Sequence, residues 1–183
     1  MAKQRRKSHT SLGKIYFWTA TIHNWYKLLQ DDKMKDIILN YLELLSNEKK
    51  ITVYAFVIMP THLHFIWEQH ILNGKETPKG SFMKYTAHTF RKYLKEENKL
   101  YLYKVDALNK SHEIWQRDSL GIEIYSRGVA KQKLDYIHRN PVKGKWNLAK
   151  DDISYYYSSA KFYETGQDEF GFLSNLYKVF DGE

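Results

Sequence analysis

The chain has no cysteine among its 183 residues, which excludes disulfides, thiolate metal sites and cysteine nucleophiles. No apolar run approaches the roughly 20 residues that a membrane span needs, and no apolar segment follows the basic N-terminus, so neither a membrane protein nor a secretory signal is expected. With 3 prolines, 9 glycines and no visible linker or repeat, residues 1–183 are expected to form a single domain. A reducing cytoplasm fits these absences.

Charge is spread unevenly along the chain. Residues 1–150 carry 27 basic and 14 acidic side chains, a balance of +13, whereas residues 151–183 carry 2 and 7, a balance of −5. A basic body is typical of proteins that bind polyanions, because each phosphate contact releases condensed counterions. Aromatic residues make up 16% of the chain, and unpaired bases stack on exposed rings. Composition therefore favours a nucleic-acid partner over a protein that merely carries many surface lysines.

Residue patterns predict alternating strands and helices. Aromatic and β-branched runs indicate strands at 14–21, 51–59 and 62–68, and apolar residues at helical spacing indicate helices at 31–45, 81–97 and 128–139. Residues 112–126 are expected to form two short strands around a turn at 118–121. The order β-α-β-β-α-β predicts an α+β, ferredoxin-like antiparallel sheet with helices on one face, leaving the other face free to carry a site.

The predicted elements divide the domain into four parts. A basic arm at 1–13 precedes the ferredoxin-like core at 14–126. A helix follows within 127–145, and it ends at Asn140 because the residue before a proline disfavours the helical backbone. The last part, 146–183, is expected to pack back as an irregular tail.

His62 and His64 form the first candidate site. Positions i and i+2 of a strand point to the same face, so the two imidazoles would project side by side and could share one metal ion. Leu63, Phe65 and Trp67 would then point to the opposite face, toward the helices. By itself the pair favours two histidines that meet by chance over a metal site.

Tyr136 is the second candidate. On the helix at 128–139 it falls about 160° from Leu134, on a polar stripe with Lys133 and Asn140, whereas a tyrosine used for packing would lie with the leucine. Asn140 follows one turn later and could supply an amide oxygen to whatever Tyr136 approaches. The alternative is a half-exposed surface tyrosine without a role.

Three motifs in order resemble one known family. MPTHLHFIWE at 59–68, IWQR at 114–117 and YIHRNPVKGKW at 136–146, followed by YYYSSAKFY, are similar to the single-tyrosine HUH transposases, most of all to REP-associated tyrosine transposases. The resemblance covers residues 16–163. Thr61 stands where members typically carry asparagine, and the segment after Pro141 departs from the usual pattern, which affects DNA contacts more than chemistry.

The resemblance implies a bacterial enzyme that nicks and rejoins single-stranded or hairpin-forming DNA. Tyr136 would be the nucleophile, forming a 5′-phosphotyrosine link, and His62, His64 and Asn140 would hold Mg²⁺ or Mn²⁺. Two imidazoles and an amide would by affinity order suit Zn²⁺ or other late metals, but the family uses Mg²⁺ or Mn²⁺. Some relatives exchange the tyrosine helix within a homodimer, while others act as monomers.

Several cations are expected to follow the DNA, or otherwise simply to coat a helix. Those crowded around the tyrosine helix are Arg127, Lys131, Lys133, Arg139, Lys143 and Lys145. The N-terminal arm adds Lys3, Arg5, Arg6 and Lys7. Tyr125 is the rival nucleophile, although it lacks an amide residue one turn later.

Two other functions stay open from the sequence. One is a protein of the same fold that binds DNA or RNA hairpins without cutting them. The other is a metal-dependent phosphohydrolase, in which water attacks and no covalent protein adduct forms. The combination of His62, His64, Tyr136 and Asn140 favours the nicking enzyme over both.

Overall fold

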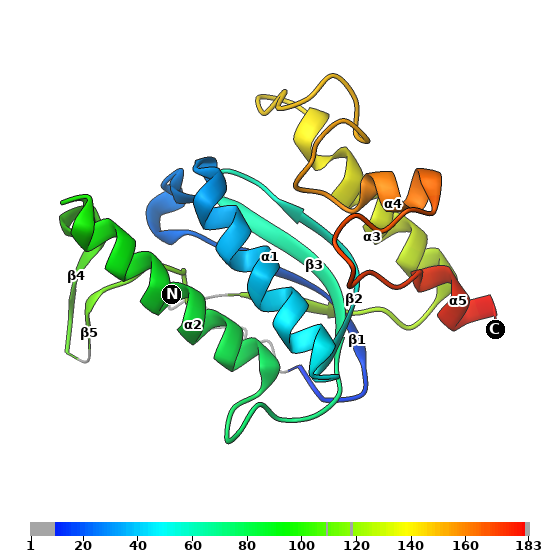
Figure 1. Cartoon of the computed structure of the whole chain (residues 1–183), viewed down its shortest axis with the longest axis horizontal. Helices are drawn as coiled ribbons and strands as arrows, with labels where there is room; N and C mark the ends of the chain where they lie inside the picture. The colour runs from blue at the N-terminus through cyan, green and yellow to red at the C-terminus, as the bar shows by residue number, and fades with distance from the viewer. Residues whose placement is uncertain (1–9, 109, 118, 182–183) are drawn as a thin grey trace, which may run out of the picture.

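The structure, a computed structural model, describes residues 10–108, 110–117 and 119–181 (Figure 1). The candidate arm residues Lys3, Arg5, Arg6 and Lys7, and Asp118 of the predicted turn, lie outside the described residues. No helix within the described part is both long enough and apolar enough to cross a membrane.

Four antiparallel strands form the central sheet. In sheet order they are β2 (Ile51–Ile58), β3 (His62–Gln69), β1 (Ile15–Thr21) and β6 (Leu120–Glu123). β3 lies between β1 and β2 and pairs with both along its length. With one helix after β1 and another after β3, this is the split ferredoxin-like arrangement, so the predicted α+β fold is confirmed.

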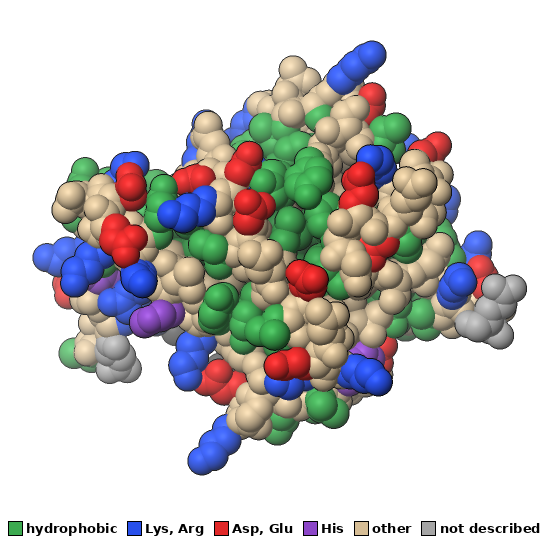
Figure 2. Space-filling view, in the orientation of Figure 1, with side chains coloured by type: hydrophobic (Ala, Val, Ile, Leu, Met, Phe, Trp, Pro, Cys, Tyr) green, Lys and Arg blue, Asp and Glu red, His purple; other side chains and the backbone are tan. Residues whose placement is uncertain are grey.

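Two helices cover one face of this sheet (Figure 1). α1 (Asp32–Asn47) and α2 (Pro78–Glu96) are capped by Asp31 and Thr77, whose side-chain oxygens accept hydrogen bonds from the first-turn N–H groups. The outer surface of this layer carries acidic and basic side chains interspersed (Figure 2). Beneath the helices lies the main core, to which the sheet contributes Trp18, Phe56, Leu63, Phe65 and Trp67.

A third long helix, α3 (Arg127–Arg139), lies on the other face of the sheet. The Ser126 hydroxyl accepts a hydrogen bond from the N–H of Val129 and caps the first turn. The helix ends in the 3-10 turn η4 (Asn140–Val142). Its apolar stripe packs on a second cluster of sheet residues, and the stripe is the predicted one: Ala130, Leu134 and Ile137.

The C-terminal part packs back on the sheet, as expected, but it is not irregular throughout. It contains two short helices, α4 (Ala160–Thr165) and α5 (Leu176–Asp181). It also follows the outer edge of β2, where Ser158 forms an isolated bridge with Val57. Six-residue helices span fewer than two turns, which is too short for apolar spacing to reveal them.

Of the two short strands predicted around a turn at 118–121, the second is present as β6 (Leu120–Glu123), which begins inside the range predicted for the turn, whereas the first is wrong. β5 (Lys110–His112) pairs instead with β4 (Lys104–Ala107) in a separate two-stranded sheet, and β6 joins the main sheet beside β1. Between β5 and β6 the buried side chain of Trp115 and its bridge to Ile22 hold the chain across the end of β1. The path of this segment is therefore set by the burial of Trp115 and its bridge to Ile22, and not by the expected local turn.

Three further 3-10 turns were not predicted. They are η1 (His23–Trp25), η2 (Leu28–Gln30) and η3 (Leu100–Tyr103). η1 and η2 follow β1 directly, so they lie at the same end of the sheet as His62. They contribute to the site described next.

Candidate active site

Two histidines of β3 form the centre of the site. In the antiparallel register, His62 lies opposite Thr21 of β1 and His64 lies opposite Thr19. Both histidines are buried, and their ring centroids are 4.9 Å apart. The expectation that the two imidazoles project side by side is confirmed, and the intervening Leu63 is buried in the core on the opposite face.

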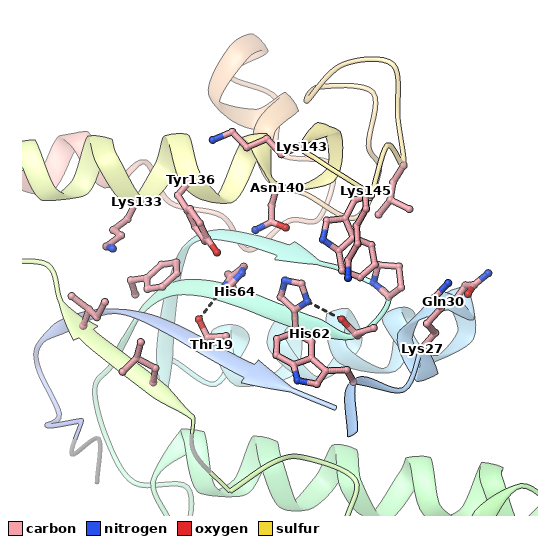
Figure 3. A pocket seen from close by; sticks show the side chains of 18 residues that line it. Thr19, Lys27, Gln30, His62, His64, Lys133, Tyr136, Asn140, Lys143 and Lys145 are labelled. Atoms are coloured by element: carbon pink, nitrogen blue, oxygen red, sulfur yellow. Dashed lines mark hydrogen bonds between the residues drawn. The ribbon is translucent and has the colours of Figure 1, made fainter. Parts of the chain in front are cut away.

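Threonine hydroxyls engage one nitrogen of each ring. The Thr61 hydroxyl lies 3.0 Å from Nδ1 of His62, and the Thr19 hydroxyl lies 2.7 Å from Nδ1 of His64 (Figure 3). Nε2 of His64 is buried and has no hydrogen-bond partner within the described residues. Leaving a buried polar atom without a partner costs about 1–3 kcal/mol, so such atoms are uncommon. This nitrogen is therefore a candidate to bind a group from outside the chain.

Burial keeps both rings uncharged. It lowers the pKa of His62 to about 4 and that of His64 to about 3, below the ordinary value of 6.5. Repulsion from His62 and from Lys133 lowers the pKa of His64 further. At neutral pH each imidazole thus has one unprotonated ring nitrogen, and the ring can bind a metal ion without first losing a proton.

Tyr136 projects from α3 toward these histidines, with its hydroxyl directed into the cleft (Figure 3). Its ring centroid lies 5.1 Å from that of His64 and 5.8 Å from that of Phe17. The side chain is 46% exposed, whereas Leu134 is buried, so the predicted placement of Tyr136 away from the packing stripe is confirmed. Tyr125, the rival nucleophile, is 76% exposed and does not line the cleft.

Asn140 stands where α3 passes into η4. It is buried, and its side chain points from the helix end toward His62 and His64 (Figure 3). Pro141 follows it and ends the regular helix. Tyr136 in α3 and Asn140 at the C-terminal cap of that helix therefore face the histidine pair one turn apart.

The residues present fit a divalent cation. Within residues 10–108, 110–117 and 119–181, no three or more His, Cys, Asp or Glu side chains gather in a metal-binding group. The available donors are the imidazoles of His62 and His64, with the amide oxygen of Asn140 as a third candidate. The unpartnered Nε2 of His64 is the observation that favours this set. A metal held by three protein donors keeps further positions open for a substrate oxygen.

A hydrogen-bonded tie fixes α3 to the sheet. Nε2 of His138 lies 2.9 Å from the Ser159 hydroxyl oxygen, which also accepts from the backbone N–H of Phe56 in β2 at 3.0 Å. Burial lowers the pKa of His138 to about 4, so the ring is neutral and can share a proton with the hydroxyl. His138 precedes Asn140 by two positions, and the tie thus holds the part of α3 that carries Tyr136 and Asn140.

A cleft of about 1060 Å³ opens over the histidines. Three of the predicted DNA-contacting lysines line it: Lys133, Lys143 and Lys145. None of the described residues that line it is acidic. Positive charge without nearby acidic groups suits a bound phosphate.

The other predicted DNA contacts lie outside this cleft. Lys131 forms an ion pair with Asp135 at 2.9 Å, and Arg127 forms one with Asp181. Arg139 is exposed and does not line the cleft. Contacts of these three side chains with DNA remain predictions.

Several lining residues were not singled out from the sequence. Phe17 and Thr19 share a face of β1, so strand alternation next to His64 could have identified both. Trp25 and Trp146 each place a ring 5.8 Å from the ring of His62. Trp25 lies in a three-residue 3-10 turn and Trp146 lies outside the helices and strands, so no periodic pattern identifies either position.

Comparison with known proteins bears on the fold. The chain matches no protein-family model and no curated protein. Among solved structures it is similar to a REP-associated tyrosine transposase bound to a REP hairpin, with 19% identity over 96% of this chain and 93% of that chain and a TM-score of 0.60. It is also similar to a candidate transposase from Deinococcus radiodurans R1, with 15% identity over 75% of this chain and 95% of that chain and a TM-score of 0.42. The first likeness confirms the expected fold over nearly the whole chain, and the second is too distant to support an argument.

Proposed function

We propose that this chain is a transposase, a metal-dependent enzyme that nicks and rejoins single-stranded or stem-loop DNA. The observation that carries the proposal is the placement of the Tyr136 hydroxyl over two neutral imidazoles, one of which has a buried nitrogen without a partner. The lysine-lined cleft supports a polyanionic substrate. The shared fold with a transposase bound to a REP hairpin supports the same substrate class.

His62, His64 and Asn140 would hold the divalent ion, Mg²⁺ or Mn²⁺ in this proposal. When bound, the ion would neutralise phosphate oxygens and polarise the phosphorus for attack. Thr61 and Thr19 orient the two rings through Nδ1, so that Nε2 of each ring is left for the ion.

Tyr136 would supply the nucleophile. Its phenolic oxygen attacks the phosphorus, the bond from phosphorus to the 3′ oxygen breaks, and that oxygen leaves with a proton as a free 3′-OH. The new 5′-phosphotyrosine bond keeps the energy of the broken one, so a 3′-OH can later attack it and rejoin a strand without ATP. Lys133 lies one turn before Tyr136, with its ammonium 5.0 Å from the Phe17 ring centroid, where it adds positive charge beside the phosphate.

The remaining lysines and arginines would bind phosphates along the DNA strand. Lys143 and Lys145 line the cleft beyond the tyrosine, and Arg127, Lys131 and Arg139 would contact phosphates farther out. Tyr136 and the histidines come from one chain, so the proposed chemistry requires no second copy. A homodimer remains a prediction.

The test uses stem-loop oligonucleotides from the genomic neighbourhood of the gene, labelled at either end and incubated with the protein in Mg²⁺, Mn²⁺ or EDTA. We expect a covalent adduct with the 5′-phosphate fragment and a free 3′-OH fragment, both absent in EDTA. Cleavage without an adduct would favour a phosphohydrolase. Tight binding without cleavage would favour a hairpin-binding protein.

A further inference from the structure

The cleft continues past His62, on the side away from Tyr136 (Figure 3). We call this part the Trp arm, because two of its lining residues are tryptophans. It is lined by Trp25, Lys27, Gln30, Lys145 and Trp146. The arm thus combines two indoles, two ammonium groups and one amide next to a proposed metal ligand.

Trp25 is held in an unfavourable backbone conformation. Asn24 and Trp25 have φ values of 51° and 56°, in the left-handed region that few residues other than glycine adopt. Such a conformation costs on the order of 1–3 kcal/mol for each residue and persists only where the surrounding structure enforces it. Trp25 is 58% exposed, so burial of this residue does not offset that cost.

Hydrogen bonds on both sides enforce this conformation. The N–H of Trp25 donates to the carbonyl of Ile22 at 2.9 Å, and the N–H of Ile22 donates to the carbonyl of Thr61 at 2.8 Å. The N–H of His23 donates to the carbonyl of Ile114 at 2.7 Å. Because these bonds join η1 to the turn before β3, the Trp25 backbone is held beside His62, and the ring centroids of the two residues lie 5.8 Å apart.

Trp146 is presented in a similar way from the opposite segment. It lies between Gly144 and Asn147, which have φ values of 58° and 41°, so this segment also turns through left-handed backbone. Its ring centroid lies 5.8 Å from that of His62, and the ammonium of Lys145 lies 5.6 Å from the Trp146 ring. Two separate segments thus bring an indole to the same imidazole.

We propose that the Trp arm is a subsite for one unpaired nucleobase of the DNA strand whose phosphate lies at the histidines. Indoles stack on any base, lysines meet the flanking phosphates, and the Gln30 amide can both donate to and accept from a base edge. Bases in a duplex are already stacked and paired, so the arm selects a single-stranded flank. This inference rests on the proposed function and adds to it the element that distinguishes an unpaired base from a bare phosphate chain.

Tryptophan fluorescence provides the test, because three of the five tryptophans are buried and the other two line the cleft. Trp18, Trp67 and Trp115 are buried, so only Trp25 and Trp146 can stack on a bound base. Titrations would use oligothymidylate, an abasic oligomer of equal length and charge, and free thymidine monophosphate. All are done with Tyr136→Phe in EDTA, where neither cleavage nor metal binding contributes. We expect oligothymidylate to quench fluorescence and to bind more tightly than the abasic oligomer.

Variants then assign the effect to the arm. Trp25→Leu and Trp146→Leu should each weaken oligothymidylate binding by about 5- to 150-fold, the range for one base–aromatic stack, and leave the abasic oligomer unchanged. Tyr101→Leu is the matched control, because Tyr101 is 69% exposed and does not line the cleft. It should bind both oligomers as the parent does.

Two results would overturn the subsite. One is equal affinity and equal quenching with the abasic oligomer, which would mean that the arm meets phosphates alone. The other is full quenching by thymidine monophosphate at the concentrations used for oligothymidylate, which would mean that the arm binds free nucleotides. Neither depends on nicking, and an enzyme that nicks without this stacking would contradict the subsite alone.

Discussion

Along β3, alternate side chains enter different environments. Leu63, Phe65 and Trp67 are fully buried beneath α1 and α2, whereas His62 and His64 face the cleft beneath α3. The face beneath α1 and α2 supplies most of the apolar burial, and the face that borders the cleft holds the polar groups. Since the two sets alternate within one strand, the same backbone that is fixed by the core also fixes the imidazoles.

Both faces contain buried nitrogens without partners, but in different settings. The indole Nε1 atoms of Trp18 and Trp67 lie in the core, where the two rings stack at 5.2 Å between centroids. Nε2 of His64 instead borders a cleft that can admit a ligand. An unpartnered donor surrounded by packed rings is a cost to stability, whereas an unpartnered imidazole nitrogen beside a cleft is a candidate for binding a ligand.

The largest expected effect is a loss of stability when a buried ring is removed from the face of β3 beneath α1 and α2. Phe65→Ala should lower the free energy of unfolding by about 3–5 kcal/mol, because it removes a fully buried ring that contacts Trp18, Trp67 and Phe82. Urea denaturation followed by circular dichroism measures this loss. A loss below about 1 kcal/mol would mean that the faces do not differ as described.

His64→Ala tests the other face of the same strand. We expect cleavage to fall by at least about 100-fold, as a proposed metal ligand is lost, while the free energy of unfolding in EDTA changes by about 1 kcal/mol at most. The lost hydrogen bond to Thr19 is offset by removal of a nitrogen that was buried without a partner. Full cleavage activity in His64→Ala would contradict the proposed metal site.

Thr19→Val tests whether the Thr19 hydroxyl orients His64, the proposed metal ligand. Valine keeps the shape but cannot bond Nδ1 of His64, so the metal concentration for half-maximal cleavage should rise about 10- to 100-fold. Cleavage should recover at saturating metal, which a general loss of folding would not allow. An unchanged metal dependence would show that the Thr19 hydroxyl does not orient the ring.

A smaller effect is expected from pH. The pKa of His62 is lowered to about 4 and that of His64 to about 3, so between pH 6.5 and these values the unfolded chain binds more protons than the folded one. The stability present above pH 6.5 is therefore lost as the pH falls, by at most about 1.4 kcal/mol per pH unit for each ring. In EDTA, the change in unfolding free energy from pH 7 to 5 should be smaller for His64→Ala than for wild type. Equal changes in both proteins would contradict the buried, neutral state of His64.

Periodicity was enough to predict much of this arrangement. Strand alternation placed His62 and His64 on one face, and the helical repeat separated Tyr136 from Leu134; both predictions agree with the structure. The order of strands and helices likewise predicted the ferredoxin-like sheet. These predictions succeed because each depends on a repeat of two or 3.6 residues within a single element.

The rest depends on contacts that no local pattern encodes. Trp25 owes its position to a left-handed backbone that hydrogen bonds to Thr61 and Ile114 enforce through its neighbours. The tie between His138 and Ser159 joins residues 21 positions apart, across the turn that follows α3. Such features follow from tertiary packing, and a sequence read element by element does not reveal them.

Attack of Tyr136 on the phosphate, the step on which the proposed function depends, is tested by peptide mapping of the covalent adduct. Wild type, Tyr136→Phe and the control Tyr125→Phe are incubated with end-labelled stem-loop DNA and Mn²⁺, digested with protease and analysed by mass spectrometry. We expect an adduct on the peptide that contains Tyr136 in wild type and in Tyr125→Phe, and none in Tyr136→Phe. The last variant should still fold and bind DNA because the ring and the lysines remain. An adduct that persists in Tyr136→Phe, or that maps to Tyr125, would contradict attack by Tyr136.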